Sequence, residues 1–212
     1  RRQRQMCIRD RYYRRLGYVR AQVGQPELTT LEDSEDGEKR YVNMRIPISE
    51  GTRYRLGELT FEGVEIMRLD AVRRQFEIDE GDYYNEKVIR DGIERAQMMY
   101  GSSGYMEFVA FPDLSPRDQV VEDDGSVSVI DAPPIVDVTI RAEEGEQYFV
   151  GRIDFSGNTT TRDKVVRREL RVFEGGVFNT EMLKISVRRL NQLGYFIPLE
   201  EDLSLIHISE PT

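Results

Sequence analysis

The stretch GELTFEG at residues 57–63 decides the fold, because it recurs as GRIDFSG at residues 151–157. The offset between the copies, 151 minus 57, is 94 residues. The same offset aligns Tyr41–Ile46 with Ile135–Ile140, Glu50–Gly51 with Glu144–Gly145, Glu80–Gly81 with Glu174–Gly175, and Tyr84–Asn85 with Phe178–Asn179. Self-similarity at a fixed offset indicates a chain built from successive copies of one supersecondary unit.

A third element ends in a Gly-Tyr pair and occurs three times, at residues 13–18, 100–105 and 190–195. Its positions divide the chain into one complete unit and two partial ones. We expect the C-terminal half of a preceding unit at 12–54, a complete unit at 55–148 and the N-terminal part of a following unit at 149–202.

The two ends of the chain are expected to be foreign to the protein, since residues 1–11 and 203–212 look like translated sequencing adapters. Back-translated with suitable codons, Met6–Asp10 is nearly the reverse complement of Leu203–Ile208. An inverted repeat at both ends is typical of transposase-inserted adapters, and such segments are excluded from fold reasoning. The alternative is a genuine basic arm and a genuine apolar tail.

The composition excludes several classes of function. Leaving out both ends removes five arginines and two acidic residues, so 25 basic and 37 acidic residues remain and the net charge changes from -9 to -12. Cys7 and His207 are removed as well, which excludes thiol chemistry, disulfides, imidazole catalysis and most zinc sites. An acidic surface repels phosphates and argues against a nucleic-acid partner. No apolar run approaches the roughly 18 residues of a membrane-spanning helix.

Each unit is predicted to have the order β-α-α-β-β. Leu59 and Phe61 alternate with polar residues, as in a strand with one buried face. The glycine after each Phe marks a turn into the first helix. Thr160–Asp163 has the spacing of a capping box, and Val166 and Leu170 follow at i and i+4 on one helical face.

The second helix of each unit is predicted to begin at Asn85 or Asn179, because the Asn side chain accepts hydrogen bonds from unpaired amides. It is expected to end at Gly-Tyr, where glycine takes the left-handed conformation. Gly92 and Ser186 are equivalent and predict close backbone packing. The apolar stripe is expected to be core, and comprises Ile89, Ile93, Ala96 and Tyr100 in one copy and Leu183, Val187 and Leu190 in the next.

Two strands are expected to close each unit, at about 105–111 and 135–141 in the complete copy and at 18–23 and 40–48 in the first. The acidic connectors between them contain Asp36-Gly37 and Asp124-Gly125, a dipeptide favoured in tight hairpin turns. Flexible acidic loops are the alternative. Glu32–Glu38 faintly resembles a calcium loop, but the acidic residue expected at the twelfth position is missing.

This combination of motifs resembles the POTRA domain. Along the predicted order β-α-α-β-β, the chain contains the motifs F-x-G-N, then E-G-x-x-[FY]-N, then L-G-Y-F. The copy over 155–171 and 190–196 looks most like the barrel-adjacent POTRA domain of the BamA family. The resemblance covers about 12–202, although the connectors are longer than usual. It implies an α+β fold of tandem POTRA repeats, each with a three-stranded mixed sheet packed on two antiparallel helices.

The resemblance also implies a non-enzymatic scaffold that receives unfolded outer-membrane proteins at an exposed edge strand, by strand addition. An edge strand without any binding role is the alternative. The implied client-binding strands are Tyr18, Val19, Arg20, Ala21, Gln22 and Val23 in the first copy and Tyr105, Met106, Glu107, Phe108, Val109, Ala110 and Phe111 in the complete one.

By the same resemblance, Arg167 and Glu174 dock an accessory lipoprotein of the BamD type, whereas ordinary solvated charges are the alternative. Periplasmic chaperones are further implied partners. The implied location is the periplasmic face of the outer membrane of a Gram-negative bacterium, held there by a C-terminal barrel outside these residues. No catalytic residue, metal or cofactor is implied.

Two other classes of function are the alternatives. An enzyme without His or Cys needs a carboxylate pair, a Ser-Lys dyad or a metal, and no carboxylate cluster here has site-like spacing. A POTRA-bearing transporter for two-partner secretion or organelle import has the same kind of repeats. The sequence downstream of these residues distinguishes that transporter from an assembly factor.

Overall fold

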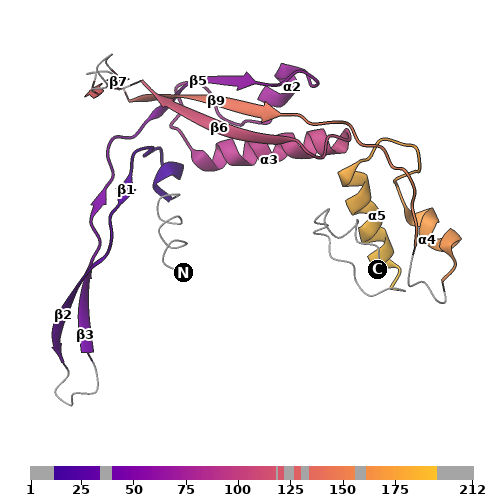
Figure 1. The fold of residues 1–212 in the computed structure, drawn as a ribbon, viewed down its shortest axis with the longest axis horizontal. Coiled ribbons are helices and arrows are strands. Elements are labelled where there is room, and N and C mark those ends of the chain that lie inside the picture. Colours follow the sequence, from indigo (N-terminus) through magenta and orange to yellow (C-terminus); the bar gives the residue numbers. More distant parts are fainter. Residues whose placement is uncertain are drawn as a thin grey trace. The chain divides into compact units, whose positions relative to one another are not determined.

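The computed structural model describes residues 12–33, 40–117, 119–121, 127–129, 134–155 and 161–194. Both expected adapter segments lie outside these ranges. The fold is α+β, as predicted (Figure 1). The first copy contributes the strands β1 (Gln22–Val23), β2 (Glu27–Asp33), β3 (Arg40–Arg45) and β4 (Ile48–Ser49).

The complete copy follows the order β-α-α-β-β, with a small hairpin added between its last two strands. Its elements are β5 (Arg55–Glu62), α2 (Leu69–Arg73), α3 (Glu86–Ser102), β6 (Val109–Pro116), β7 (Gln119–Val121), β8 (Val127–Val129) and β9 (Ile135–Glu143). The last copy contributes α4 (Asp163–Glu169) and α5 (Thr180–Gln192).

The main sheet has three strands in the order β5-β9-β6, so β9 is central and both other strands are edges. β5 and β9 are parallel, with Leu56 beside Val136 and Leu59 beside Val138. These four side chains are buried, and the N-terminal half of α3 covers this face of the sheet (Figure 1). Thr60, Asp137 and Thr139 lie on the opposite face, called the open face below, and are partly exposed in the described part of the chain.

Contacts within the described residues divide the chain into two compact units. The first unit comprises 12–62, 76–92 and 111–141, and the second comprises 63–75, 93–110 and 142–194. Each unit contains one junction between successive copies of the repeat.

The two junctions use the same backbone hydrogen bonds. In the first unit, Tyr54 N donates to Gly17 O at 2.8 Å, and Tyr84 N donates to Tyr54 O at 3.1 Å. In the second unit, the equivalent bonds join Tyr148 N to Gly104 O at 2.9 Å and Phe178 N to Tyr148 O at 2.9 Å. The repeat in sequence is therefore a repeat of junction geometry as well.

The predicted helix caps are confirmed for the second helix of each copy. Asn85 Oδ1 accepts from Lys87 N, and Asn179 Oδ1 accepts from Met182 N, both at 2.9 Å. Gly104 ends the α3 region at a φ of 94°, in the left-handed region. The apolar stripe of α3 is core, since Ile89, Ala96 and Tyr100 are buried.

The predicted strands of the first copy are wrong in their extents. Tyr18–Val23 is strand only at Gln22–Val23, because β1 pairs with β4 over two residues and the described residues place no third strand beside it. The predicted strand at 40–48 is interrupted before Ile48 by Pro47, which has no N–H for a ladder. Its first part, β3, pairs with β2 in an antiparallel hairpin around the acidic connector.

Two further predictions on local structure are wrong. Ile153 and Phe155 form no strand in the described part of the chain, and the equivalent strand β5 needs its distant partner β9 to make a ladder. The predicted capping box does not set the start of α4, because its N-cap is Arg162, which makes no side-chain cap. Thr160 itself lies outside the described residues. Val166 and Leu170 are buried, as predicted.

Candidate interaction sites

The outer edge of β6 is the first candidate site. Because β6 lies at one end of the strand order, only one of its backbone edges is paired within the sheet. Val109 and Phe111, on this strand, are 39% and 63% exposed. An edge strand that carries exposed apolar side chains offers backbone pairing to an extended segment of another chain.

The strand begins later than predicted, so Tyr105–Phe108 belongs to the turn after α3. Two contacts hold this turn in the second unit. Phe108 is buried and stacks on Tyr100, with the ring centroids 4.1 Å apart. Glu107 accepts a hydrogen bond from the Tyr148 hydroxyl at 2.6 Å. Of the predicted client-binding residues in this copy, only Val109, Ala110 and Phe111 therefore lie on the edge strand.

The first copy offers a much shorter edge. Tyr18, Val19 and Arg20 lie in turns, and Ala21 and Val23 are buried. Gln22 is the one exposed residue of the two-residue strand β1. The predicted client-binding segment of this copy is therefore mostly not available as a strand edge.

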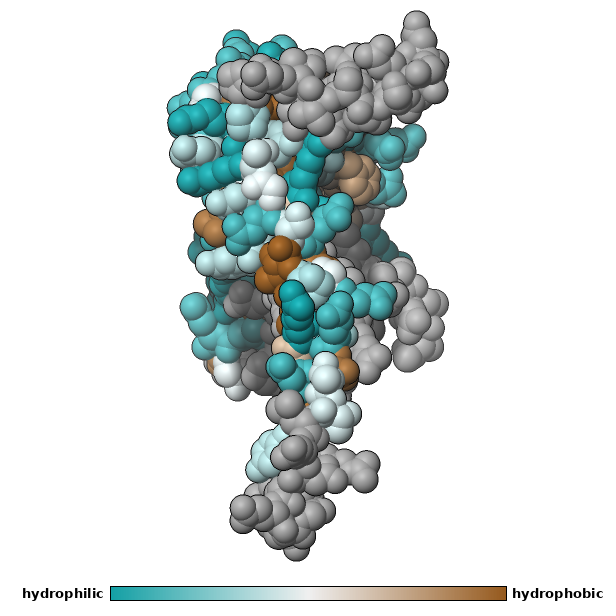
Figure 2. All heavy atoms as spheres, turned by 90° about the vertical axis from the view of Figure 1, so that its left-hand side faces the viewer, coloured by the Kyte–Doolittle hydropathy of each residue, from teal (hydrophilic) through white to brown (hydrophobic). Residues whose placement is uncertain are grey.

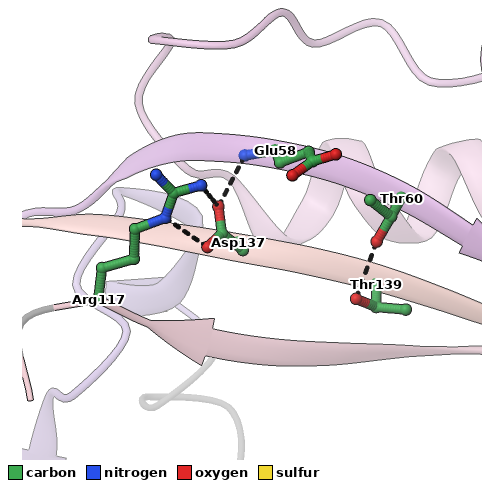
Figure 3. A network of polar contacts seen from close by, with 5 residues as sticks. All are labelled: Glu58, Thr60, Arg117, Asp137 and Thr139. Atoms are coloured by element: carbon green, nitrogen blue, oxygen red, sulfur yellow. Dashed lines mark hydrogen bonds and ion pairs between the residues drawn. The ribbon is translucent and has the colours of Figure 1, made fainter. Parts of the chain in front are cut away.

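The open face of the main sheet carries a polar network that the sequence analysis did not single out (Figure 3). Arg117 donates from Nε and Nη2 to the two carboxylate oxygens of Asp137, at 2.5 and 2.7 Å. The hydroxyls of Thr60 and Thr139 lie 2.9 Å apart on the neighbouring strands. Bidentate arginine–carboxylate pairs fix geometry as well as charge.

Asp137 also accepts a hydrogen bond from the backbone of β5. The pairing of β5 with β9 shifts between Leu56 and Leu59, which is a β-bulge. Glu58 N lies in this bulge and donates to Asp137 Oδ1 at 2.8 Å (Figure 3). A β-carbon on Gly57 would collide with the same carboxylate oxygen. The sequence feature that could have pointed to Asp137 is the repeat. It aligns Asp137 with Asn43, which also has a short side chain with an oxygen acceptor.

Arg167 and Glu174, the predicted lipoprotein-docking pair, contact each other in the second unit. Arg167 Nη1 donates to Glu174 Oε1 at 3.0 Å. Both side chains also hold the backbone of Ile153, because Ile153 N donates to Glu174 Oε1 and Arg167 Nη2 donates to Ile153 O, each at 2.9 Å. The Arg167 guanidinium lies 5.3 Å from the ring centroid of Phe155.

This pair is half-exposed, with 46% of the Arg167 side chain and 44% of the Glu174 side chain accessible. The Ile153 amide, followed by the Arg167 guanidinium, lowers the pKa of Glu174 below its ordinary value. Glu174 is therefore a stable anion, and part of each charged group remains accessible to another protein.

The surface drawn in Figure 2 is mostly hydrophilic, and its hydrophobic residues form small separate groups. None of the helices in the described ranges is both long enough and apolar enough to cross a bilayer. Scattered apolar residues on a charged surface are ordinary in proteins, so this face adds no further candidate site.

Comparison with known families gives two matches along the chain. The family profile "POTRA: Surface antigen variable number repeat" matches residues 54–145 and again residues 148–199. The chain belongs to the POTRA family. Two consecutive POTRA matches agree with the internal repeat of the sequence.

Curated relatives of this POTRA chain include two proteins named outer membrane protein assembly factor BamA. The protein of Neisseria meningitidis serogroup B is 28% identical over 193 residues, which cover 90% of this chain and 22% of that protein. The protein of Nitratidesulfovibrio vulgaris is 27% identical over 191 residues, which cover 88% of this chain and 22% of that protein. The POTRA chain thus spans about a fifth of the length of these relatives.

Among solved structures, the crystal structure of Haemophilus influenzae BamA POTRA3-5 resembles this chain with a TM-score of 0.62. The identity is 24%, and the match covers 91% of this chain and 69% of that one. This similarity supports the POTRA fold.

Proposed function

We propose that this chain is the periplasmic POTRA scaffold of an outer-membrane β-barrel assembly protein. In this proposal, unfolded outer-membrane clients add a strand to the outer edge of β6, and an accessory lipoprotein docks at Arg167 and Glu174. Periplasmic chaperones deliver the clients. The observation that carries the proposal is a POTRA sheet whose edge strand presents Val109 and Phe111 to solvent.

Strand addition suits a receptor for many clients, because main-chain hydrogen bonds do not depend on client sequence. The opposite edge, on β5, is less open. Leu56 N donates to Asp82 O, and Gly81 N donates to Leu56 O, so a neighbouring loop already pairs with the start of that strand. This difference favours β6 as the receiving edge.

Site-specific photocrosslinking on the full chain tests the client site. A photoreactive amino acid at Phe111 is expected to crosslink to a urea-unfolded barrel protein diluted into buffer. The matched control is Lys87, an exposed residue of α3 away from the sheet edge. Equal crosslinking at both positions would mean that contact with the client is non-specific.

The docking proposal rests on the half-exposed Arg167–Glu174 pair. A charge pair at the solvent-exposed rim of a protein–protein interface contributes mainly to the orientation of the partner and to the association rate. The charge reversal Arg167→Glu is expected to weaken binding of a purified BamD-type lipoprotein about tenfold, equivalent to about 1.4 kcal/mol. The matched control is Arg73→Glu, because Arg73 and Glu80 occupy the same positions in the complete copy.

The variant Glu174→Gln distinguishes docking from a purely internal role. Glutamine keeps a side-chain oxygen that accepts from Ile153 N but removes the negative charge. If the pair only holds the Ile153 backbone, this variant binds the lipoprotein like the parent chain. If the pair is the docking site, binding weakens while circular dichroism shows a folded chain.

A further inference from the structure

The two backbone edges of β6 differ in the residues that they present. Arg117 N, directly after the strand, donates to Ile135 O of β9 at 2.9 Å. Backbone groups alternate between the two edges of a strand. Odd-numbered residues of β6 therefore point their backbone groups toward β9, and even-numbered residues point theirs outward.

Two of the outward positions are prolines, Pro112 and Pro116. Proline has no N–H and is found in sheets where its nitrogen faces away from the ladder, which agrees with this assignment. The outward edge therefore has carbonyl acceptors at Ala110, Pro112, Leu114 and Pro116, but amide donors only at Ala110 and Leu114.

The side chains beside these two donors differ in polarity. Val109 and Phe111 flank Ala110, and both are apolar and exposed. Asp113 and Ser115 flank Leu114, and Asp113 forms an ion pair with Arg141 at 3.1 Å. An incoming strand with an apolar residue on the open face gains hydrophobic contact near Ala110, whereas near Leu114 it meets a charged pair.

We infer that a client strand pairs with β6 around Ala110 and that Pro112 ends the ladder. This inference rests on the proposed function and specifies its register. The segment that fits is a short extended strand, with one apolar side chain placed between Val109 and Phe111. The missing donors at Pro112 and Pro116 also limit pairing between the edges of two copies of this chain, as proline does on other edge strands.

Three variants of the full chain test this register, with a fluorescent strand peptide from an outer-membrane barrel as the probe. Ala110→Pro removes the first donor, and the loss of one main-chain hydrogen bond at about 1 kcal/mol is expected to weaken binding about fivefold. Leu114→Pro is the matched control and is expected to change binding less than twofold. Pro112→Ala adds a donor and is expected to strengthen binding severalfold.

Amide hydrogen exchange of the unmodified chain gives a second measurement that needs no proline variant to fold. Addition of the peptide is expected to slow exchange at the Ala110 amide and to leave the Leu114 amide unchanged. Equal effects at both residues would overturn the register and leave strand addition intact. No effect at either residue, in exchange or in binding, would overturn strand addition at β6 itself.

Discussion

The aromatic ring of Phe76 lies directly on the backbone of Gly92. A β-carbon built on Gly92 would be 2.5 Å from Cδ1 of Phe76, much closer than normal packing permits. Phe76 is buried and packs edge-to-face on Phe61, with the ring centroids 5.2 Å apart. Close packing at this glycine was predicted from its place in the apolar stripe of α3, and it is confirmed.

Gly92→Ala is therefore expected to destabilise the chain. Overpacking costs about 1–3 kcal/mol, and the better helix propensity of alanine offsets up to about 1 kcal/mol of this. Urea unfolding measures the difference. Phe76→Leu introduces the residue that the last copy has at the equivalent Leu170, and in this background Gly92→Ala is expected to cost much less. A Gly92→Ala chain as stable as the parent would contradict the observed packing.

Glu144 is a buried carboxylate whose replacement is expected to be costly. It accepts hydrogen bonds from Glu65 N, Ile66 N and the Tyr100 hydroxyl. Glu144→Leu leaves two amides unsatisfied, at about 1–3 kcal/mol each. Thermal or urea unfolding is expected to show a loss of at least about 2 kcal/mol, against less than about 0.5 kcal/mol for Glu143→Gln on the exposed neighbour.

The same contact affects the ionisation of Tyr100. Burial, followed by the hydrogen bond to Glu144, raises the pKa of Tyr100 well above that of an ordinary tyrosine. Ultraviolet titration is therefore expected to show the same number of tyrosines ionising in the ordinary range in the parent chain and in Tyr100→Phe. Glu144→Gln is expected to lower this pKa, and an unchanged titration would contradict the hydrogen bond.

Asp137 is expected to give the sheet a defined acid sensitivity. The Arg117 guanidinium, together with Glu58 N, lowers the pKa of Asp137 below its ordinary value. A carboxyl with a depressed folded-state pKa stabilises the fold above its unfolded pKa, and this contribution is lost as the pH falls through the folded pKa. Carboxyl NMR titration is expected to show the Asp137 pKa rising in Arg117→Met but not in the control Arg141→Met.

Asn85 and Asn179 cap equivalent helices, yet aspartate is expected to have opposite effects at the two positions. Asn85 acts as an acceptor through Oδ1, so Asn85→Asp keeps the cap and adds a favourable charge at a helix N-terminus. Asn179 also donates from Nδ2 to Ser102 O at 2.7 Å. Asn179→Asp loses that donor and is expected to cost about 1 kcal/mol, measured by urea unfolding. Equal effects at both positions would rule out a role for the Ser102 contact.

The sequence by itself determined the features that depend on neighbouring residues. Asn85 and Asn179 cap their helices because the accepting side chain and the donating amide are two or three residues apart. Gly104 ends the α3 region because only glycine takes a φ of 94° without strain. The offset of 94 residues aligns Tyr54 with Tyr148, and the two tyrosines make the same backbone bonds at their junctions.

Only the tertiary structure decided where the strands begin and end, because a strand needs a partner that is distant in sequence. β5 pairs with β9 across 79 residues, measured from Thr60 to Thr139, whereas Ile153 and Phe155 have the same pattern and form no strand in the described part of the chain. The sequence singled out Arg167 and Glu174 separately. Their contact with each other and with the Ile153 backbone depends on how α4 and the following loop pack, which no local spacing records.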